Sequence, residues 1–336
     1  MTLPERINAF VSLGEELKNL SPAQKQEIIF RAGNANSWFD ANNVTNALNG
    51  IIYLLDKENL QDWLFVYDLE NITPKKVGVI MAGNIPMVGF HDFLSVLLSG
   101  HYLHAKLSSE DNYLMKMLAE RLVNIEPRFA ERIYFVELLK EADAIIATGS
   151  DNTARYFEYY FSKKPHIIRK NRTSLGILTG EETTADFRAL AEDIFSYYGL
   201  GCRNVSKVLV PESYSFTPFY DAIASFKYIL DHNKYQNNYD YNKSILLVNR
   251  AEHFDNGFLL LTPSEQLVSP ISVLFYQTYA SADDLKNQLE AVKDKTQVIV
   301  SADGWYPNSI AFGQAQCPAV WDYADGVDTL TFLSKL

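Results

Sequence analysis

The chain has 336 residues, 47% of them hydrophobic, so it can bury one large core or two medium ones. Its formal net charge is −11 and its lysines and arginines are scattered, which excludes the basic surface that nucleic-acid binding needs. No stretch approaches the roughly 18 apolar residues of a membrane span, and the first residues lack a signal-peptide pattern, so we expect a cytoplasmic protein.

The chain is predicted to begin with helices and then to alternate strands and helices. Apolar residues at three- and four-residue spacing predict helices over residues 1 to about 65. From Lys76 onward, short apolar runs alternate with amphipathic segments, which is typical of βαβ units around a parallel sheet. Strands are predicted at 76–83, 101–107, 132–138 and 142–150, with helices at 87–100, 111–125 and 151–164.

A second α/β half is predicted after these elements. It would begin with a strand pair across 165–180 and a long helix over 182–201 that ends in glycines, as helix C-termini often do. The remaining predicted elements are strands at 206–211, 244–249, 258–262, 272–279 and 296–303, and helices at 216–232 and 281–293. The fold class is therefore α/β, with two α/β lobes, mostly parallel sheets and a helical N-terminal lead-in.

Cysteine and acidic residues show no pattern of a metal site. Cys202 and Cys317 lie far apart with no CxxC or Cys/His spacing, which argues against a disulfide framework or a structural zinc site. Asp322, Asp325 and Asp328 lack the glycine and terminal glutamate of a calcium loop, so a solvated acidic turn is expected there. We expect reduced thiols and no metal.

Polar residues follow the first predicted strand at the point where it ends. Gly83, Asn84 and Pro86 come directly after the strand, and an apolar helix follows at once. Ligands of open α/β sheets bind at this edge, where the Asn84 amide could donate to a developing oxyanion. A tight βα turn that merely needs asparagine's tolerance of unusual backbone angles explains the same residues.

Two further strand ends carry candidate ligand-binding residues. Lys106 ends the next strand, where its ammonium could contact a ribose or phosphate, although a lone lysine is more often simply solvated. Ser109, near it, is uncharged where an acidic residue would repel phosphate. Gly149 and Ser150 lead from a strand into a helix, a turn that can cradle a pyrophosphate or only cap the helix. No GxGxxG pattern occurs in the chain.

Cys202 lies in a glycine-flanked turn between a helix and an apolar strand. Gly199 and Gly201 would let the chain turn sharply and let a substrate approach closely. A thiolate is a strong nucleophile, and turn N–H groups or a nearby cation such as Arg203 would lower the thiol pKa. A small buried cysteine that acts as a hydrophobe is the alternative, and the residues alone leave both open.

In this order, these motifs resemble those of the aldehyde dehydrogenase superfamily, and within it the LuxC-type acyl-CoA reductases. "GLGCRNVSKVLVPES" is similar to the superfamily's nucleophile segment and "AGNIPM" to the turn with its oxyanion-hole asparagine, which implies these catalytic roles for Cys202 and Asn84. "HYLHAKLSSED" and "ATGSDNTARYF" resemble the cofactor-binding segments, which implies contacts of Lys106 with the adenine ribose and of Gly149 and Ser150 with the pyrophosphate.

The resemblance covers roughly residues 76 to 300 and implies an aldehyde-dehydrogenase-like fold. Residues 1–182 would form the helical lead-in and the nucleotide-binding domain, residues 183–312 the catalytic domain with the cysteine, and residues 313–336 a tail returning to the body. A homo-oligomer is expected from the resemblance alone.

Three positions depart from the superfamily pattern. Gln266 stands where a glutamate holds the nicotinamide ribose, four residues before Pro270. Arg169 stands approximately where hydrolytic members carry the glutamate that activates water, which suits acyl transfer to and from a thiol. Ser109 replaces a glutamate that NAD-preferring members commonly use to bond the ribose and repel a 2′-phosphate, so NADPH is expected.

The resemblance therefore implies a reductase that converts a fatty acyl-CoA thioester, expected to be long-chain, to the aldehyde through a Cys202 acyl-enzyme. Two alternatives remain open: an enzyme that oxidises aldehydes to carboxylates, and an inactive nucleotide-binding or scaffold protein of the same fold. The acyl donor could be coenzyme A, a carrier protein or a partner enzyme, and the proton donor to the thiohemiacetal is not identifiable from the sequence.

Overall fold

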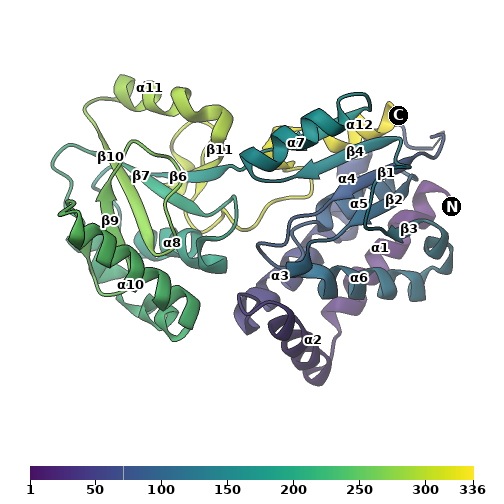
Figure 1. Cartoon of the computed structure of the whole chain (residues 1–336), viewed down its shortest axis with the longest axis horizontal. Helices are drawn as coiled ribbons and strands as arrows, with labels where there is room; N and C mark the ends of the chain where they lie inside the picture. Colours follow the sequence, from purple (N-terminus) through teal and green to yellow (C-terminus); the bar gives the residue numbers. More distant parts are fainter. Residues whose placement is uncertain (71) are drawn as a thin grey trace. The chain divides into compact units, whose positions relative to one another are not determined.

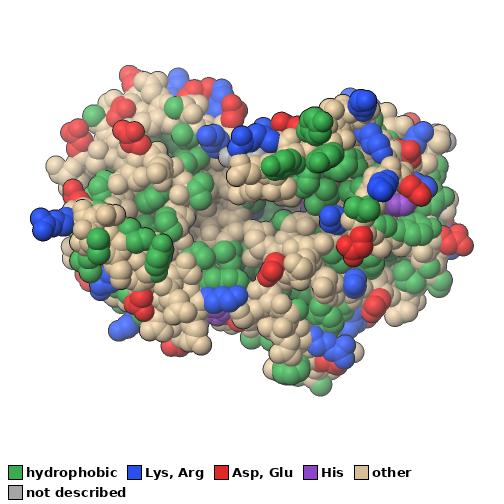
Figure 2. Space-filling model, in the orientation of Figure 1, with side chains coloured by type: hydrophobic (Ala, Val, Ile, Leu, Met, Phe, Trp, Pro, Cys, Tyr) green, Lys and Arg blue, Asp and Glu red, His purple; other side chains and the backbone are tan. Residues whose placement is uncertain are grey.

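The computed structural model describes residues 1–70 and 72–336, and its chain path is drawn in Figure 1. The chain forms two compact units: the first comprises Met1–Asn171 and Pro318–Leu336, and the second comprises Arg172–Cys317. Among the described residues, no helix is long and apolar enough to cross a membrane. Lysine, arginine and acidic side chains are interspersed over the face drawn in Figure 2, in line with the scattered charges of the sequence.

Four helices open the first unit, and each begins at a residue that caps it. They are α1 (Leu3–Lys18), α2 (Pro22–Ala35), α3 (Ala41–Leu54) and α4 (Lys57–Leu64), capped by Thr2, Ser21, Asp40 and Asp56. Each capping oxygen accepts a backbone N–H that the first helical turn leaves unpaired. The apolar stripe of α1 buries Phe10, Leu13 and Leu17, as the predicted helical spacing requires.

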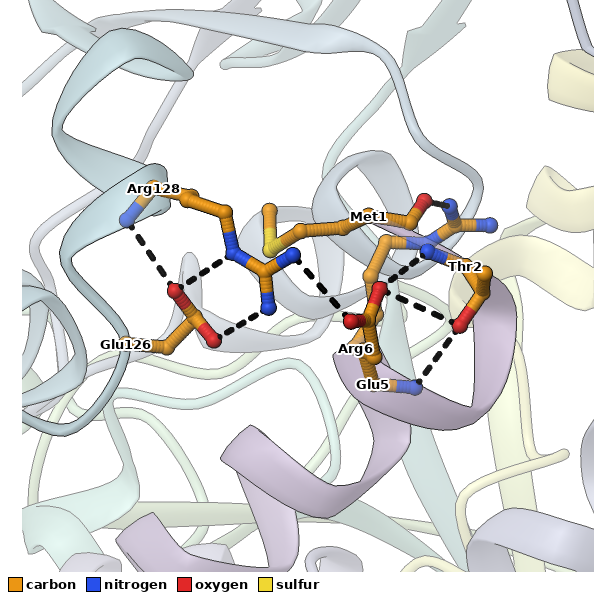
Figure 3. A network of polar contacts seen from close by, with 6 residues as sticks. All are labelled: Met1, Thr2, Glu5, Arg6, Glu126 and Arg128. Atoms are coloured by element: carbon orange, nitrogen blue, oxygen red, sulfur yellow. Dashed lines mark hydrogen bonds and ion pairs between the residues drawn. The ribbon is translucent and has the colours of Figure 1, made fainter.

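Arg6 ties the N-terminal helix to the body of the first unit from a buried position. Its guanidinium donates to the carbonyl oxygens of Leu98 (2.8 Å), Met1 (2.8 Å) and Leu69 (3.0 Å), and the residue is only 6% exposed. Figure 3 shows the bond to Met1 beside an outer network, in which Arg128 pairs with Glu5 and Glu126 at the surface. The buried bonds are worth more than the exposed ion pairs because water competes less for them.

We expect the substitution Arg6→Met to lower the free energy of unfolding by about 2–4 kcal/mol, because it leaves buried carbonyl groups without donors while keeping most of the aliphatic packing. Arg128→Met removes only solvent-exposed pairs and serves as the matched control, with little expected effect. Urea denaturation of both variants measures the difference. Equal losses in the two would contradict this ranking of buried over exposed contacts.

A five-stranded parallel sheet forms the centre of the first unit, in the order β3-β2-β1-β4-β5. Its strands are β1 (Lys76–Ile80), β2 (Tyr102–Lys106), β3 (Ile133–Phe135), β4 (Ala144–Thr148) and β5 (His166–Arg169). The helices of this unit that follow the lead-in are α5 (Phe90–Leu98), α6 (Asn112–Ile125), α7 (Asp151–Phe161) and α12 (Thr329–Ser334). The strand order reverses between β1 and β4, the switch point at which open α/β sheets bind ligands.

The second unit is built on a seven-stranded sheet, in the order β12-β11-β6-β7-β10-β9-β8, parallel except for the β8–β9 pair. Its strands are β6 (Thr173–Ile177), β7 (Val205–Pro211), β8 (Phe254–Asp255), β9 (Leu260–Pro263), β10 (Val273–Tyr279), β11 (Thr296–Ser301) and β12 (Ile310–Ala311). Its α-helices are α8 (Thr184–Phe195), α9 (Thr217–Ala222), α10 (Asn233–Val248) and α11 (Ala282–Val292).

Two details differ from the sequence-based expectations. The strand predicted at 244–249 is wrong, because residues 244–248 complete α10, with Leu246 packed against the apolar cluster of Tyr239, Leu260, Val273 and Phe275. The predicted pair across 165–180 is two strands, β5 and β6, of different sheets. The compact units divide after Asn171 and before Pro318, and β6 pairs with β7 and β11 in the second unit; the functional division expected at residues 182 and 312 stays a prediction.

Candidate active site

Asn84 lies on the open loop that follows β1 in the first unit. Its side chain is exposed, whereas Pro86 and Met87, a few residues on, are buried. Met87 adopts a left-handed backbone conformation with φ of 58°, which is unfavourable for a residue with a side chain. The loop therefore needs support from the structure around it.

Asp111 supplies that support from beneath the loop. Its Oδ2 accepts the Met87 N–H at 2.5 Å, the residue is 3% exposed, and its buried Oδ1 has no hydrogen-bond partner in the described structure. Burial raises the pKa of Asp111 to about 6, although hydrogen bonds from the Met87 and Leu114 N–H groups pull it down. No pattern in the sequence points to this role, because a single aspartate after a strand usually caps a helix.

Lys106 and Ser109 lie on the strand end next to the Asn84 loop. Lys106 is the last residue of β2 and is in register with Ile80 of β1, so both strands end at the same edge. The Met81 N–H donates to the Lys106 carbonyl at 3.0 Å, which extends this pairing toward the loop. Ser109 is exposed and opens a short 3₁₀ turn that ends at Asp111.

Gly149 and Ser150 form the turn between β4 and α7. Ser150 caps α7, its Oγ accepting the Thr153 N–H at 3.3 Å. A Cβ added at Gly149 would lie 3.1 Å from side-chain atoms of Thr153 and Phe157, so a side chain there would crowd the helix. Because β4 pairs with β1, this turn and the Asn84 loop follow neighbouring strands at the switch point. Uncharged turns at this place and a helix N-terminus fit the pyrophosphate of a dinucleotide.

Arg169 is buried at the end of β5 and is part of an ion pair. Its guanidinium donates to Asp92 Oδ2 on α5 at 2.6 Å and to Thr329 Oγ1 on α12 at 2.9 Å, and it is 4% exposed. Breaking one partner of such a pair leaves an uncompensated charge in the core. Arg169 therefore joins three elements of the first unit, and no carboxylate stands at its position.

In the second unit, Cys202 is exposed in the segment between α8 and β7. Tyr197, Tyr198 and Gly199, which precede it, take left-handed φ values of 52°, 57° and 78°. Only the glycine adopts that conformation without strain, so two consecutive tyrosines must be held by packing. Tyr197 is buried, and the Tyr198 ring lies 4.4 Å from the His232 ring, centre to centre.

The segment around Cys317 packs beside the Cys202 turn. Arg203 Nε donates to the Ala315 carbonyl at 2.5 Å, and buried Asp193 of α8 accepts the N–H groups of Gly313 (2.7 Å) and Ala315 (2.9 Å). Burial raises the pKa of Asp193 to about 6, and burial likewise raises the pKa of the Cys317 thiol. These contacts give Cys317 a neighbourhood that disfavours a thiolate. Neither cysteine forms a disulfide in the described part of the chain.

Gln266 is exposed on the segment between β9 and β10, and its N–H donates to Ser264 Oγ at 3.1 Å. Lys207, on β7, supports this segment from below and is only 4% exposed. Its ammonium donates to Gln277 Oε1 at 2.5 Å and to the Glu265 carbonyl at 3.3 Å, and burial lowers its pKa. The signal that could have found Lys207 is a lysine inside the otherwise apolar strand "SKVLVP". No cluster of His, Cys, Asp or Glu that could hold a metal occurs in residues 1–70 and 72–336.

Several solved structures with a similar fold are of aldehyde dehydrogenases. One from Mycobacterium tuberculosis in complex with NAD+ has a TM-score of 0.65 and 15% identity, over 90% of this chain and 73% of that one. Aldehyde dehydrogenase 21 from Physcomitrella patens, solved with succinate, has a TM-score of 0.68 and 13% identity, over 100% and 84%. The Bacillus cereus enzyme with NAD+ has a TM-score of 0.63 and 12% identity, over 90% and 72%. The protein has an aldehyde-dehydrogenase-like fold.

The family model "Acyl-CoA reductase (LuxC)" matches residues 19–224. This chain belongs to that family. A search of curated protein sequences returns no match. Family and fold together support an oxidoreductase that acts on acyl or aldehyde groups with a nicotinamide cofactor, as the resemblance in the sequence implied.

The raised pKa of Asp111 predicts a pH-dependent stability difference. The folded state holds this proton more tightly than the unfolded chain, whose carboxyl titrates near 3.8, so the contribution of Asp111 to stability falls as pH rises from about 4 to about 6. Asp111→Asn removes that titration. As the pH rises from about 4 to about 7, we expect the free energy of unfolding of the variant to rise by roughly 3 kcal/mol relative to that of the native protein.

Urea unfolding of both proteins at pH 4 and pH 7 measures this gain. Asp193 titrates in both proteins, so its contribution to the pH dependence of stability cancels in the comparison. A stability difference that is the same at both pH values would show that Asp111 titrates normally.

Proposed function

We propose that this protein reduces a fatty acyl-CoA thioester to the aldehyde through an acyl-enzyme on Cys202, with NADPH as the reductant. The observation that carries the proposal is the exposed Cys202 thiol directly after a strained, left-handed turn. Strain of this kind persists only where the surrounding structure holds it, and it gathers at functional sites. Membership of the LuxC family supports the acyl-CoA substrate.

The first half-reaction transfers the acyl group. The Cys202 thiolate attacks the thioester carbonyl, a carbon–sulfur bond forms, and the bond to coenzyme A breaks so that coenzyme A leaves as its thiolate, which takes up a proton equivalent to the one that Cys202 released. The Asn84 amide and a backbone N–H of the Cys202 turn donate to the oxyanion that develops on the carbonyl oxygen.

The residues at the switch point fit a dinucleotide cofactor, whose chemistry when bound is hydride donation. Lys106 would hold the adenine ribose, Gly149 and Ser150 the pyrophosphate, and Gln266 the nicotinamide ribose. Ser109 leaves uncharged space where a glutamate would repel a 2′-phosphate, which favours NADPH over NADH. Reduction turns the Cys202 thioester into a thiohemiacetal, which collapses to the aldehyde and frees the thiol.

The Arg169 pair supports reduction over hydrolysis. Because Arg169 is bonded to Asp92 and Thr329, no carboxylate at that position is available to activate water against the thioester. An acyl-enzyme that water attacks slowly survives long enough to be reduced.

The central test is intact mass after mixing the protein with long-chain acyl-CoA in the absence of nicotinamide cofactor. We expect an acyl-sized adduct on the native protein and on Cys317→Ser, and none on Cys202→Ala. Adding NADPH to the isolated acyl-enzyme should discharge it as aldehyde, faster than NADH does. If no adduct forms at any chain length, or if the adduct persists in Cys202→Ala, the proposed nucleophile is wrong.

For Asn84→Ala, we expect turnover to fall by roughly a hundredfold, as for the loss of one oxyanion donor, with little change in thermal stability because the side chain is exposed. Steady-state reduction of acyl-CoA and a thermal melt measure the two effects. Asn112→Ala, the same change at another exposed asparagine of the first unit, controls for the nonspecific effect of removing an amide. Near-native turnover in Asn84→Ala would remove this residue from the mechanism.

A further inference from the structure

The position of Cys202 in the segment that follows α8 presents an electrostatic problem. The last carbonyl groups of a helix carry partial negative charge, which opposes a thiolate nearby and raises a thiol pKa. Here the helix ends at Phe195, seven residues before the cysteine in the sequence, and the chain folds back through the left-handed turn. An exposed nucleophile in this place needs those carbonyl groups to be covered.

The Asn204 side chain covers them. It is 2% exposed, and its Nδ2 donates to the carbonyl oxygens of Asp193 (3.0 Å), Ile194 (3.4 Å) and Ser196 (2.8 Å) at the end of α8. On its other side, Oδ1 accepts the N–H of Gly201, the residue before the cysteine, at 2.8 Å. One buried amide thus joins the end of the helix to the turn that carries Cys202.

The main chain locks this amide in place. The Asn204 N–H donates to the Gly201 carbonyl at 3.1 Å, which closes the turn around Cys202. Ser174 of β6 donates its N–H to the Asn204 carbonyl at 3.1 Å and its Oγ to the Cys202 carbonyl at 3.2 Å. Because both ends of the turn are fixed to a central strand, the direction of the Cys202 side chain depends on this set of bonds.

We propose that Asn204 is a positioning residue that aims the Cys202 thiol and shields it from the negative end of α8. This inference rests on the proposed function of Cys202 as the nucleophile. Loss of the amide would leave the carbonyl groups at the end of α8 without their hydrogen-bond donor. It would also leave the Gly201 N–H without its acceptor. The thiol would then become both less acidic and less well directed.

Other ionisable groups near the turn do not explain such a change. Arg203 is adjacent to Cys202 and keeps its charge over the whole accessible pH range. Asp193 and Glu192 lie on α8, where burial raises the pKa of each, and Asp193 is bonded to the segment that carries Cys317. Both carboxyls are present in every variant compared, so their titration cancels, and a serine at position 317 removes the second thiol.

The test measures the reactivity of Cys202 with iodoacetamide between pH 6 and pH 10, by intact mass, in a Cys317→Ser background. In Asn204→Ala we expect the alkylation midpoint to move to higher pH and the rate at pH 7 to fall roughly tenfold, as for a thiol pKa raised by one unit. Acyl transfer from acyl-CoA should fall roughly a hundredfold, the size of effect that a misplaced reacting group produces, with a smaller change in KM.

Thr262→Val is the matched control, because Thr262 is buried in the same unit and its Oγ1 donates to one backbone carbonyl, that of Glu252, at 2.7 Å. It should lower thermal stability without moving the alkylation profile. Asn204→Ser keeps one hydrogen-bond donor, so we expect its alkylation midpoint to lie between those of the native protein and Asn204→Ala. This variant provides the test if Asn204→Ala does not fold.

An unchanged alkylation profile in folded Asn204 variants, or an equal shift in Thr262→Val, would overturn the inference. A native protein that is alkylated but never acylated would instead contradict the proposed function, while the alkylation shift would still report on Asn204.

Discussion

The sharp turns at the edges of the two sheets depend on buried polar side chains, which form hydrogen bonds with the backbone of each turn. A loop that must present an exposed group cannot satisfy all its N–H and C=O groups through regular secondary structure, and a buried group without a partner costs free energy. Asp111 holds the Asn84 loop through the Met87 N–H, and Asn204 holds the Cys202 turn through the Gly201 N–H. The position of each proposed catalytic side chain therefore depends on one buried polar residue behind it.

The buried and strained groups at these sites lower the stability of the fold. A buried carboxyl with a raised pKa, such as Asp111 or Asp193, destabilises the fold at neutral pH, where an apolar or neutral residue would not. The left-handed tyrosines before Cys202 add strain of their own. Proteins commonly break local rules of this kind at functional sites. Met87 and the two tyrosines lie at the turns that the proposed chemistry needs, while other left-handed residues, such as Ser213 and Arg250, lie outside them.

Features that depend on hydrophobic periodicity and on the ends of apolar strands were predictable from the sequence. Strands β1, β2 and β4 were located together with Asn84, Lys106 and Gly149, because each candidate directly follows or ends an apolar run. The sequence did not reveal Asp111 or Asn204, because their roles come from contacts made after folding. Lys207 was overlooked, although it interrupts an apolar strand. The helix at 244–248 was mistaken for a strand because "SILLV" is an apolar run whose helical contacts involve residues distant in the sequence, such as Leu260 and Phe275.

A buried polar contact also favours the proposed reduction over hydrolysis. A thioester intermediate is reduced to the aldehyde only if its hydrolysis by water is slower than hydride transfer. The site must therefore lack a general base positioned to activate water. At the position where hydrolytic relatives are expected to carry such a base, the guanidinium of Arg169 is held between Asp92 and Thr329. Asp92 is itself buried and bonded to Arg169, so its carboxylate is committed to the fold. Replacing Arg169 by glutamate would remove the partner of buried Asp92 and place two carboxyl groups together in the core, which would destabilise the fold.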